Sequence, residues 1–159
     1  MAGKGAREVA LLALSACEKQ GAWSDGFLKK AIRDSGMDSR DAALCTRLCF
    51  GVLQNKLYLD DLIGRFCDIK LKKLENKVLQ ALRLGVYQMR FLTRIPHSAA
   101  VNESVNLARR YAKNPRAAGL VNGVLRSLSR AGEELPEPDD LFFRYSHTAW
   151  ITNEWIQMM

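Results

Sequence analysis

Apolar side chains recur at helical spacing along most of the chain. In residues 6–20 and 25–35 they follow a period of about 3.6 residues, and a glycine, Gly21 or Gly36, stands where each pattern stops. Because glycine is a common helix terminator, these positions predict two separate N-terminal helices. Ser24 is placed to cap the second of them.

The next apolar-periodic segment, residues 40–67, is long. Asp38 or Ser39 can start it, and both residue types are favoured at the position before a helix because their side chains accept backbone hydrogen bonds there. The segment is either one long helix or two helices separated by a bend near Gly51 or Asn55.

Three further helices are predicted after this segment. In residues 74–92 apolar side chains occupy most of the helical circumference, which is typical of a helix in the middle of a bundle. Pro96 separates this helix from residues 97–112, and Pro115 separates those from residues 116–130, because proline interrupts a helix. We find no convincing strand, so the pattern predicts an all-α fold.

The C-terminal part of the chain differs from the helical part. Residues 131–140 are acidic, contain two prolines and lack periodicity, so we interpret them as a linker that follows a core domain of residues 1–130. Residues 141–159 are rich in aromatic and aliphatic side chains. That much apolar surface is expected either to fold back onto the bundle or to begin a further domain.

Composition limits the class of protein. The 159 residues carry a formal net charge of +7 and are 48% hydrophobic, which suffices for a sizeable core. The four cysteines lie in apolar helical stretches with no signal peptide before them, which predicts reduced thiols in the cytoplasm. No apolar run approaches the roughly 20 residues of a membrane-spanning helix, so no membrane partner is expected.

The positive charge is uneven, and residues 94–130 contain seven basic side chains but only one acidic side chain. On a helical wheel of residues 97–113, an apolar arc faces the core and a polar row lies on another side. The row consists of Asn102, Asn106, Arg109 and Lys113, with Glu103 and Arg110 beside it.

The helix predicted for residues 116–130 has a similar arrangement. Its leucines, valines and Ala117 share one side of the wheel, which is expected to pack on the core. The opposite side carries one amide and three arginines: Asn122, Arg116, Arg126 and Arg130.

Two interpretations of these polar faces are open. A solvated surface is the ordinary role of charged helical side chains. However, exposed helices often pair Glu with Lys or Arg four residues apart, and such acids are nearly absent here. Uncompensated arginines repel one another unless a polyanion lies across them, which favours a nucleic acid as partner. Asn102 and Asn122 either contact that partner or satisfy a helix end or loop carbonyl.

Other clusters are interpreted with the same two alternatives. Lys4 and Arg7 lie at the start of the first helix, where the macrodipole disfavours cations, so a phosphate-binding role is favoured over a purely structural one. The basic residues of segment 70–77 are assigned to a solvated loop.

The residues that could carry chemistry do not assemble into a catalytic set. Cys45 and Cys49 are four residues apart on an apolar face without further ligands, so we interpret them as a buried pair and predict no metal site. His97 stands at a helix entry, where capping explains it as well as catalysis does. No strand precedes a glycine-rich turn, so a doubly wound nucleotide pocket is not expected.

The motifs resemble those of a known family. "LQALRLGVYQMRFLTRIPHSAAVNESVNLARRY" and "AAGLVNGVLRSL" are similar to the helical NusB-like RNA-binding domain, and the resemblance spans residues 6–130. The version at the N-terminus of the RsmB/Sun/Fmu 16S rRNA (cytosine-5) methyltransferases fits best, because those chains continue with a segment like "RYSHTAWITNEWI". Thr148 departs from the family, which has proline at that position.

This resemblance implies a bundle of about six or seven helices in two subbundles that holds ribosomal RNA while another domain methylates a cytosine. The family's catalytic cysteines and its S-adenosylmethionine site lie beyond this chain, so no catalytic residue and no cofactor are expected within it. Asn102 and Asn122 match the family's asparagines, and Arg126 matches its basic position. The expected phosphate contacts are Lys4, Arg7, Arg109, Arg110, Lys113, Arg116, Arg126 and Arg130.

Two alternatives stay open at this point. A free-standing NusB-type antitermination factor would also meet a ribosomal protein. A docking module would bind its own C-terminal methyltransferase domain, and its charge would be incidental. In each case the chain by itself is not expected to be an enzyme.

Overall fold

The computed structural model describes residues 3–21, 23 and 25–138, so the predicted Ser24 cap and the segment 141–159 lie outside the described residues. The described chain contains seven α-helices and two short 3-10 helices and no strand, which confirms the all-α prediction. The α-helices are α1 (Ala6–Gln20), α2 (Asp25–Ser35), α3 (Ser39–Gln54), α4 (Lys56–Phe66), α5 (Asn76–Phe91), α6 (His97–Tyr111) and α7 (Ala117–Ala131). The 3-10 helices are η1 (Leu71–Lys73) and η2 (Gly132–Glu134).

Local chemistry explains where the helices begin and end. Gly21 and Gly36 follow α1 and α2 with φ of 73°, a left-handed conformation that glycine adopts without strain. The side chain of Asp38 caps α3 by accepting a hydrogen bond of 2.8 Å from the backbone N–H of Asp41. The long segment divides at Asn55, whose side chain donates to the carbonyl of Gly51 at 2.9 Å, so it forms two helices.

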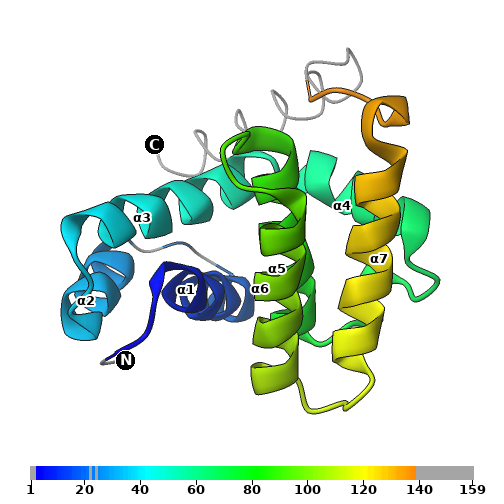
Figure 1. Ribbon diagram of the computed structural model, residues 1–159. Helices are drawn as coiled ribbons and strands as arrows, with labels where there is room; N and C mark the ends of the chain where they lie inside the picture. Colours follow the sequence, from blue (N-terminus) through cyan, green and yellow to red (C-terminus); the bar gives the residue numbers. More distant parts are fainter. Residues whose placement is uncertain (1–2, 22, 24, 139–159) are drawn as a thin grey trace, which may run out of the picture.

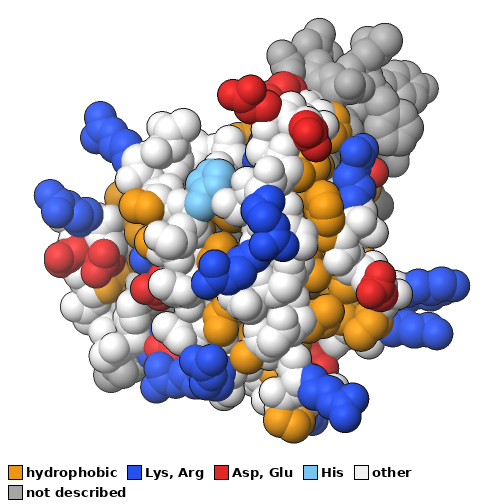
Figure 2. Space-filling model, turned by 45° about the vertical axis from the view of Figure 1, so that its right-hand side comes forward, with side chains coloured by type: hydrophobic (Ala, Val, Ile, Leu, Met, Phe, Trp, Pro, Cys, Tyr) orange, Lys and Arg blue, Asp and Glu red, His pale blue; other side chains and the backbone are white. Residues whose placement is uncertain are grey.

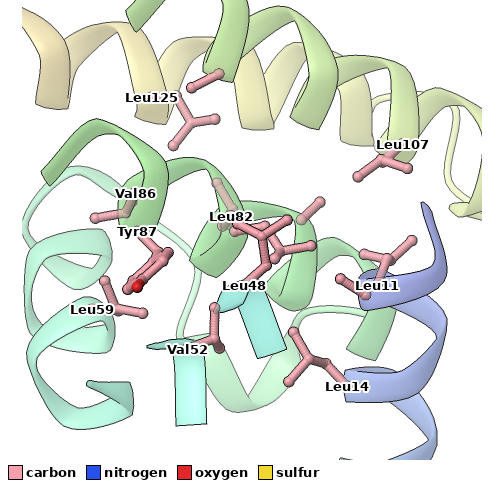
Figure 3. Packing of buried hydrophobic residues seen from close by; sticks show 14 of the residues in the cluster. Leu11, Leu14, Leu48, Val52, Leu59, Leu82, Val86, Tyr87, Leu107 and Leu125 are labelled. Carbon is pink, nitrogen blue, oxygen red and sulfur yellow. The ribbon is translucent and has the colours of Figure 1, made fainter. Parts of the chain in front are cut away.

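The helices form two groups that meet along α5. In the first group α1 packs against α2 and α3, and in the second group α4, α6 and α7 pack against α5 (Figure 1). Leucines from both groups converge at this junction, where Leu11, Leu48 and Leu82 are fully buried (Figure 3). Burial on nearly every side of α5 confirms its predicted place in the middle of the bundle.

Two glycines permit close approach between helices. A Cβ on Gly51 would overlap the ring of Tyr87, so α3 can lie against α5 only without a side chain at this position. A Cβ on Gly85 would come within 2.8 Å of the Ser104 hydroxyl and 2.6 Å of Leu125. Glycine therefore brings α5 close enough to α6 and α7 to fix the position of that pair.

The first residues of the predicted linker contact the bundle. Leu135 is buried, and the hydroxyl of Tyr58 donates a 2.7 Å hydrogen bond to the carbonyl of Pro136. Arg90 donates to the carbonyls of Gly132 and Pro136 at 3.1 and 3.3 Å. The packed structure thus continues past Arg130, while the domain boundary near that residue stays a prediction.

Candidate nucleic-acid interface

Helices α6 and α7 run antiparallel, side by side, and are joined by the short loop of residues 112–116 (Figure 1). A shallow groove of about 500 Å³ lies between them. Ala118 and Gly119 on α7 leave it open, since a Cβ on Gly119 would meet nothing within 4 Å. The other residues that line the groove are Asn102, Val105, Asn106, Arg109 and Asn122.

The polar row predicted for α6 lies on the surface. Asn102, Asn106, Arg109 and Lys113 are all exposed, whereas Val101 and Ala108 are buried. Basic side chains project from the middle and lower parts of the face that carries α7, and a group of acidic ones lies at its upper end (Figure 2). The helical wheel therefore placed the polar face of α6 correctly with respect to solvent.

Two arginines beside this groove are held by amides of their own helices. Arg109 donates to the side-chain oxygen of Asn106 at 3.1 Å, and Arg126 donates to that of Asn122 at 2.8 Å. Neither arginine forms an ion pair with a described residue. An amide orients a guanidinium without neutralising it, so both keep a full charge and further N–H donors for a phosphate.

The two asparagines of the family motif have different surroundings. Asn102 is exposed and its side-chain amide has no hydrogen-bond partner among the described residues, whereas the side-chain oxygen of Asn122 accepts from Arg126. Both line the groove, but no hydrogen bond joins them. Asn122 therefore orients a cation, and the amide of Asn102 is available to a ligand.

The loop between α6 and α7 brings two more of the predicted cations to the surface. Lys113 and Arg116 are exposed, and neither forms an ion pair within the described chain. The carboxylate of Glu75, at the start of α5, accepts from the backbone N–H groups of Lys113 at 2.8 Å and Asn114 at 3.1 Å. The first of these hydrogen bonds is the main reason that the pKa of Glu75 lies below its usual value of 4.5.

Further along α7, Arg130 is exposed, and within the described residues its side chain donates one hydrogen bond, to the Ser127 hydroxyl at 3.4 Å. His97, which the sequence placed at a helix entry, is the first residue of α6, and its Nδ1 lies 2.9 Å from the hydroxyl of Ser129 on α7. This contact joins the two helices at the end opposite to the loop.

The remaining predicted cations are engaged near the N-terminus of α1. The carboxylate of Glu8 accepts from Arg110 at 2.7 Å and from the hydroxyl of Tyr111 at 2.8 Å. Arg7 donates to the side-chain oxygen of Gln88 at 2.7 Å. These contacts join α1 to α5 and α6, so the partners of Arg7 and Arg110 lie on other helices, whereas Arg109 and Arg126 bond to amides of their own helices.

Lys4 lies beside the Tyr111 hydroxyl in the same cluster. Burial and the hydrogen bond to Glu8 raise the pKa of Tyr111, and the hydrogen bond from Lys4 acts in the opposite direction. Lys4, which precedes α1, therefore lies near the end of α6.

Sequence reasoning did not identify Glu75 or Glu8. Both are acids that contact residues distant in the chain, so a pattern within one helix carries no signal for them.

The cysteines and other metal-ligand residues do not form a further site in the described part. Cys45 and Cys49 are buried and free, and their mutual hydrogen bond, together with burial, raises the pKa of Cys49. Residues 3–21, 23 and 25–138 contain no group of three or more His, Cys, Asp or Glu side chains that could hold a metal. Within the same residues, no helix has the length and apolar character to span a membrane.

Comparison with known proteins gives consistent matches. The model of the NusB family matches residues 4–130. The probable ribosomal RNA small subunit methyltransferase B of Bacillus subtilis (strain 168) is 37% identical over 154 residues, which covers 94% of this chain and 34% of that protein. A protein of the same description from Synechocystis sp. is 33% identical and covers 81% of this chain and 29% of its own length. The chain thus spans about a third of the length of these relatives.

Solved structures have the same fold. NusB of T. maritima superposes with a TM-score of 0.71 at 25% identity, covering 82% of this chain and 91% of that one. A crystal structure of antitermination factors NusB and NusE in complex with dsRNA matches with a TM-score of 0.72 at 24% identity, covering 80% of this chain and 95% of that one. The latter match supports the fold alone.

Proposed function

Because the chain belongs to the NusB family, we propose that it is an RNA-binding domain whose α6–α7 surface holds ribosomal RNA. The observation that carries this proposal is that Arg109 and Arg126, which flank an amide-lined groove, have no acidic partner among the described residues. Lys113, Arg116 and Arg130 extend the same surface. Phosphate contacts of this kind position RNA without reading its sequence.

The proposal includes a parent protein that methylates a cytosine of 16S rRNA. It is supported by the relatives named as ribosomal RNA methyltransferases. The B. subtilis match covers 94% of this chain, so it extends beyond the 4–130 region of the family model, which favours this reading over a free-standing antitermination factor. Because this substrate is ribosomal RNA, we infer a cytoplasmic location. We also infer that the chain interacts with the parent's own methyltransferase domain. A ribosomal-protein partner stays a prediction.

S-adenosylmethionine, the methyl donor of such an enzyme, does not fit the described residues. They contain no strand, and therefore no glycine-rich turn between a strand and a helix, which is how doubly wound sheets bind such ligands. The donor belongs to the proposed catalytic domain, and this chain contributes binding and orientation of RNA.

A charge-reversal experiment tests the RNA surface. Arg109, Lys113 and Arg126 are replaced together by Glu in the 159-residue chain, and binding to a 16S rRNA transcript is measured by filter binding over a range of salt. We expect the salt dependence to flatten by about 2, since each lost contact to single-stranded RNA removes about 0.7 from the slope. Affinity should fall at least tenfold.

The matched control reverses three exposed cations on α2, namely Lys29, Lys30 and Arg33. This triple variant has the same net charge, but α2 packs mainly against α1 and α3, and none of its residues lines the groove. Equal losses in both variants would mean that binding follows net charge and would refute the assignment to α6–α7. No binding by the native chain at low salt would refute the RNA proposal itself and favour a docking module.

A further inference from the structure

The loop between α6 and α7 carries Lys113 and Arg116, and an acid lies beside it. Glu75 lines a second groove, of about 260 Å³, together with Lys73 and Arg116. A carboxylate in this position repels phosphate, which opposes the proposed function of the surface. Its position therefore requires an explanation in terms of its contacts.

Glu75 uses both carboxylate oxygens to hold the backbone of the loop. Oε1 accepts from the N–H of Lys113 at 2.8 Å, and Oε2 accepts from the N–H of Asn114 at 3.1 Å. Glu75 stands at the cap position of α5, yet its side chain makes no capping hydrogen bond to that helix. The carboxylate is thus committed to a segment almost forty residues away in sequence.

The hydrogen bonds continue from this loop into α7. The side-chain oxygen of Asn114 accepts from the backbone N–H of Arg116 at 2.9 Å, and its carbonyl accepts from the N–H of Ala117 at 3.1 Å. Glu75 therefore anchors a continuous series of contacts that ends at the first turn of α7. Lys113 and Arg116 lie within that series, and their side chains are exposed.

We propose that Glu75 is a positioning residue of the RNA surface, which holds the α6–α7 loop so that Lys113 and Arg116 face the phosphates of bound RNA. This inference rests on the proposed function. Glu75 acts through the loop and does not touch RNA itself. The gain in RNA affinity from fixing two cations exceeds the repulsion between RNA and one carboxylate, because two N–H groups already stabilise its negative charge by hydrogen bonds.

The direction in which one substitution changes RNA affinity tests this inference. Glu75→Gln removes a negative charge from a basic surface, so electrostatics alone would strengthen RNA binding. We expect the opposite, because the amide NH₂ of Gln cannot accept a backbone hydrogen bond. Affinity for the 16S rRNA transcript should fall about fivefold near 0.1 M salt, with the salt slope reduced by about 0.7, the value of one phosphate contact.

Glu103→Gln is the matched control. Glu103 lies beside the polar row of α6 and is exposed, and its carboxylate has no hydrogen-bond or ion-pair partner among the described residues. Removing its charge should strengthen RNA binding about twofold, through relief of long-range repulsion alone. The two Glu→Gln variants are therefore expected to change affinity in opposite directions.

A double-mutant cycle separates positioning from a general effect on folding. In a chain that carries Lys113→Ala and Arg116→Ala, Glu75→Gln has no cations to misplace, and it should leave affinity unchanged or raise it slightly. A fivefold loss in that background would show that Glu75 acts on the fold in general and would overturn the inference. Thermal melting of every variant checks that binding is measured on folded protein.

The outcomes separate this inference from the proposed function. If the native chain fails to bind the transcript, the proposed function is wrong. If the native chain binds and Glu75→Gln binds equally well or more tightly, the proposed function survives and the positioning role of Glu75 is wrong.

Discussion

Arg83 on α5 and Arg126 on α7 carry the same guanidinium group in opposite surroundings. The side chain of Arg83 is only 4% exposed, and its Nε and Nη2 each lie 2.8 Å from a carboxylate oxygen of Asp60, with Glu18 at 3.5 Å. Arg126 is exposed, and its hydrogen bond goes to the neutral amide of Asn122. One charge is neutralised within the protein, and the other is only oriented.

The difference separates structural cations from cations that can bind a ligand. Burial raises the pKa of Glu18, but Arg83 and Lys56 outweigh that effect and leave the pKa below its usual value, so α1, α4 and α5 are joined by attraction between opposite charges. Arg110 belongs with this group through its ion pair with Glu8, although the residue before it, Arg109, belongs to the groove. Basic composition alone does not make this distinction.

The largest effect on stability is expected for Arg83→Met. The substitution leaves the carboxylate of Asp60 without its bidentate partner, and we expect the free energy of unfolding to fall by about 2–3 kcal/mol, below the range for fully buried pairs because Asp60 is partly exposed. Urea denaturation followed by circular dichroism measures the change. Adding Asp60→Asn should recover part of the loss, and no recovery would argue against the ion pair as its cause.

RNA affinity provides a second test of the difference between cations with and without an ion pair. Arg83→Met should bind the 16S rRNA transcript within twofold of the native chain when measured well below its melting temperature. A tenfold weaker affinity of the folded variant would mean that the paired cations also contribute to RNA binding.

A smaller loss of stability is expected for Tyr111→Phe. Tyr111 shares its partner Glu8 with the ion-paired Arg110. The substitution removes the hydrogen bond to Glu8 and should lower the free energy of unfolding by about 1 kcal/mol. Burial and, after it, the hydrogen bond to Glu8 raise the pKa of Tyr111 above its usual value of 10.0. The stabilisation that Tyr111 gives the folded state is therefore present at neutral pH and is lost as pH rises through the folded-state pKa. The difference between native and Phe chains should therefore shrink in alkaline urea titrations, and a constant difference would contradict this origin.

Periodicity predicted most of the α-helices and their exposed faces. Apolar spacing decides which side of α6 packs on α5, so Val101 and Asn102 could be assigned to core and surface without coordinates. The break in the long segment was harder to locate because Gly51 and Asn55 are both helix-disfavouring residues. Gly51 instead stays within α3, where it makes room for the ring of Tyr87.

Contacts between distant residues could not be predicted in this way. Glu8 meets Arg110, and Glu75 meets the N–H of Lys113, only after α1, α5 and α6 have packed. Their positions on the helix predict a phosphate contact for both Arg109 and Arg110. The two differ because Arg110 forms an ion pair with a residue of another helix, and Arg109 does not. The predicted phosphate contacts are therefore a mixture of paired and unpaired cations.

The smallest effect on stability is expected for Arg126→Ala, which completes the comparison. Its side chain is exposed and, among the described residues, hydrogen-bonds a neutral amide alone, so the free energy of unfolding should change by less than about 0.5 kcal/mol. RNA affinity should nevertheless fall about fivefold near 0.1 M salt, and the salt slope should fall by about 0.7.

Arg110→Ala is the matched substitution on α6. Because it leaves the nearly buried Glu8 without its ion pair, it should destabilise the fold more and affect RNA binding less. Denaturation and filter binding on both variants would show this reversal, and equal behaviour of the two arginines would remove the distinction between paired and unpaired cations on which the RNA surface was assigned.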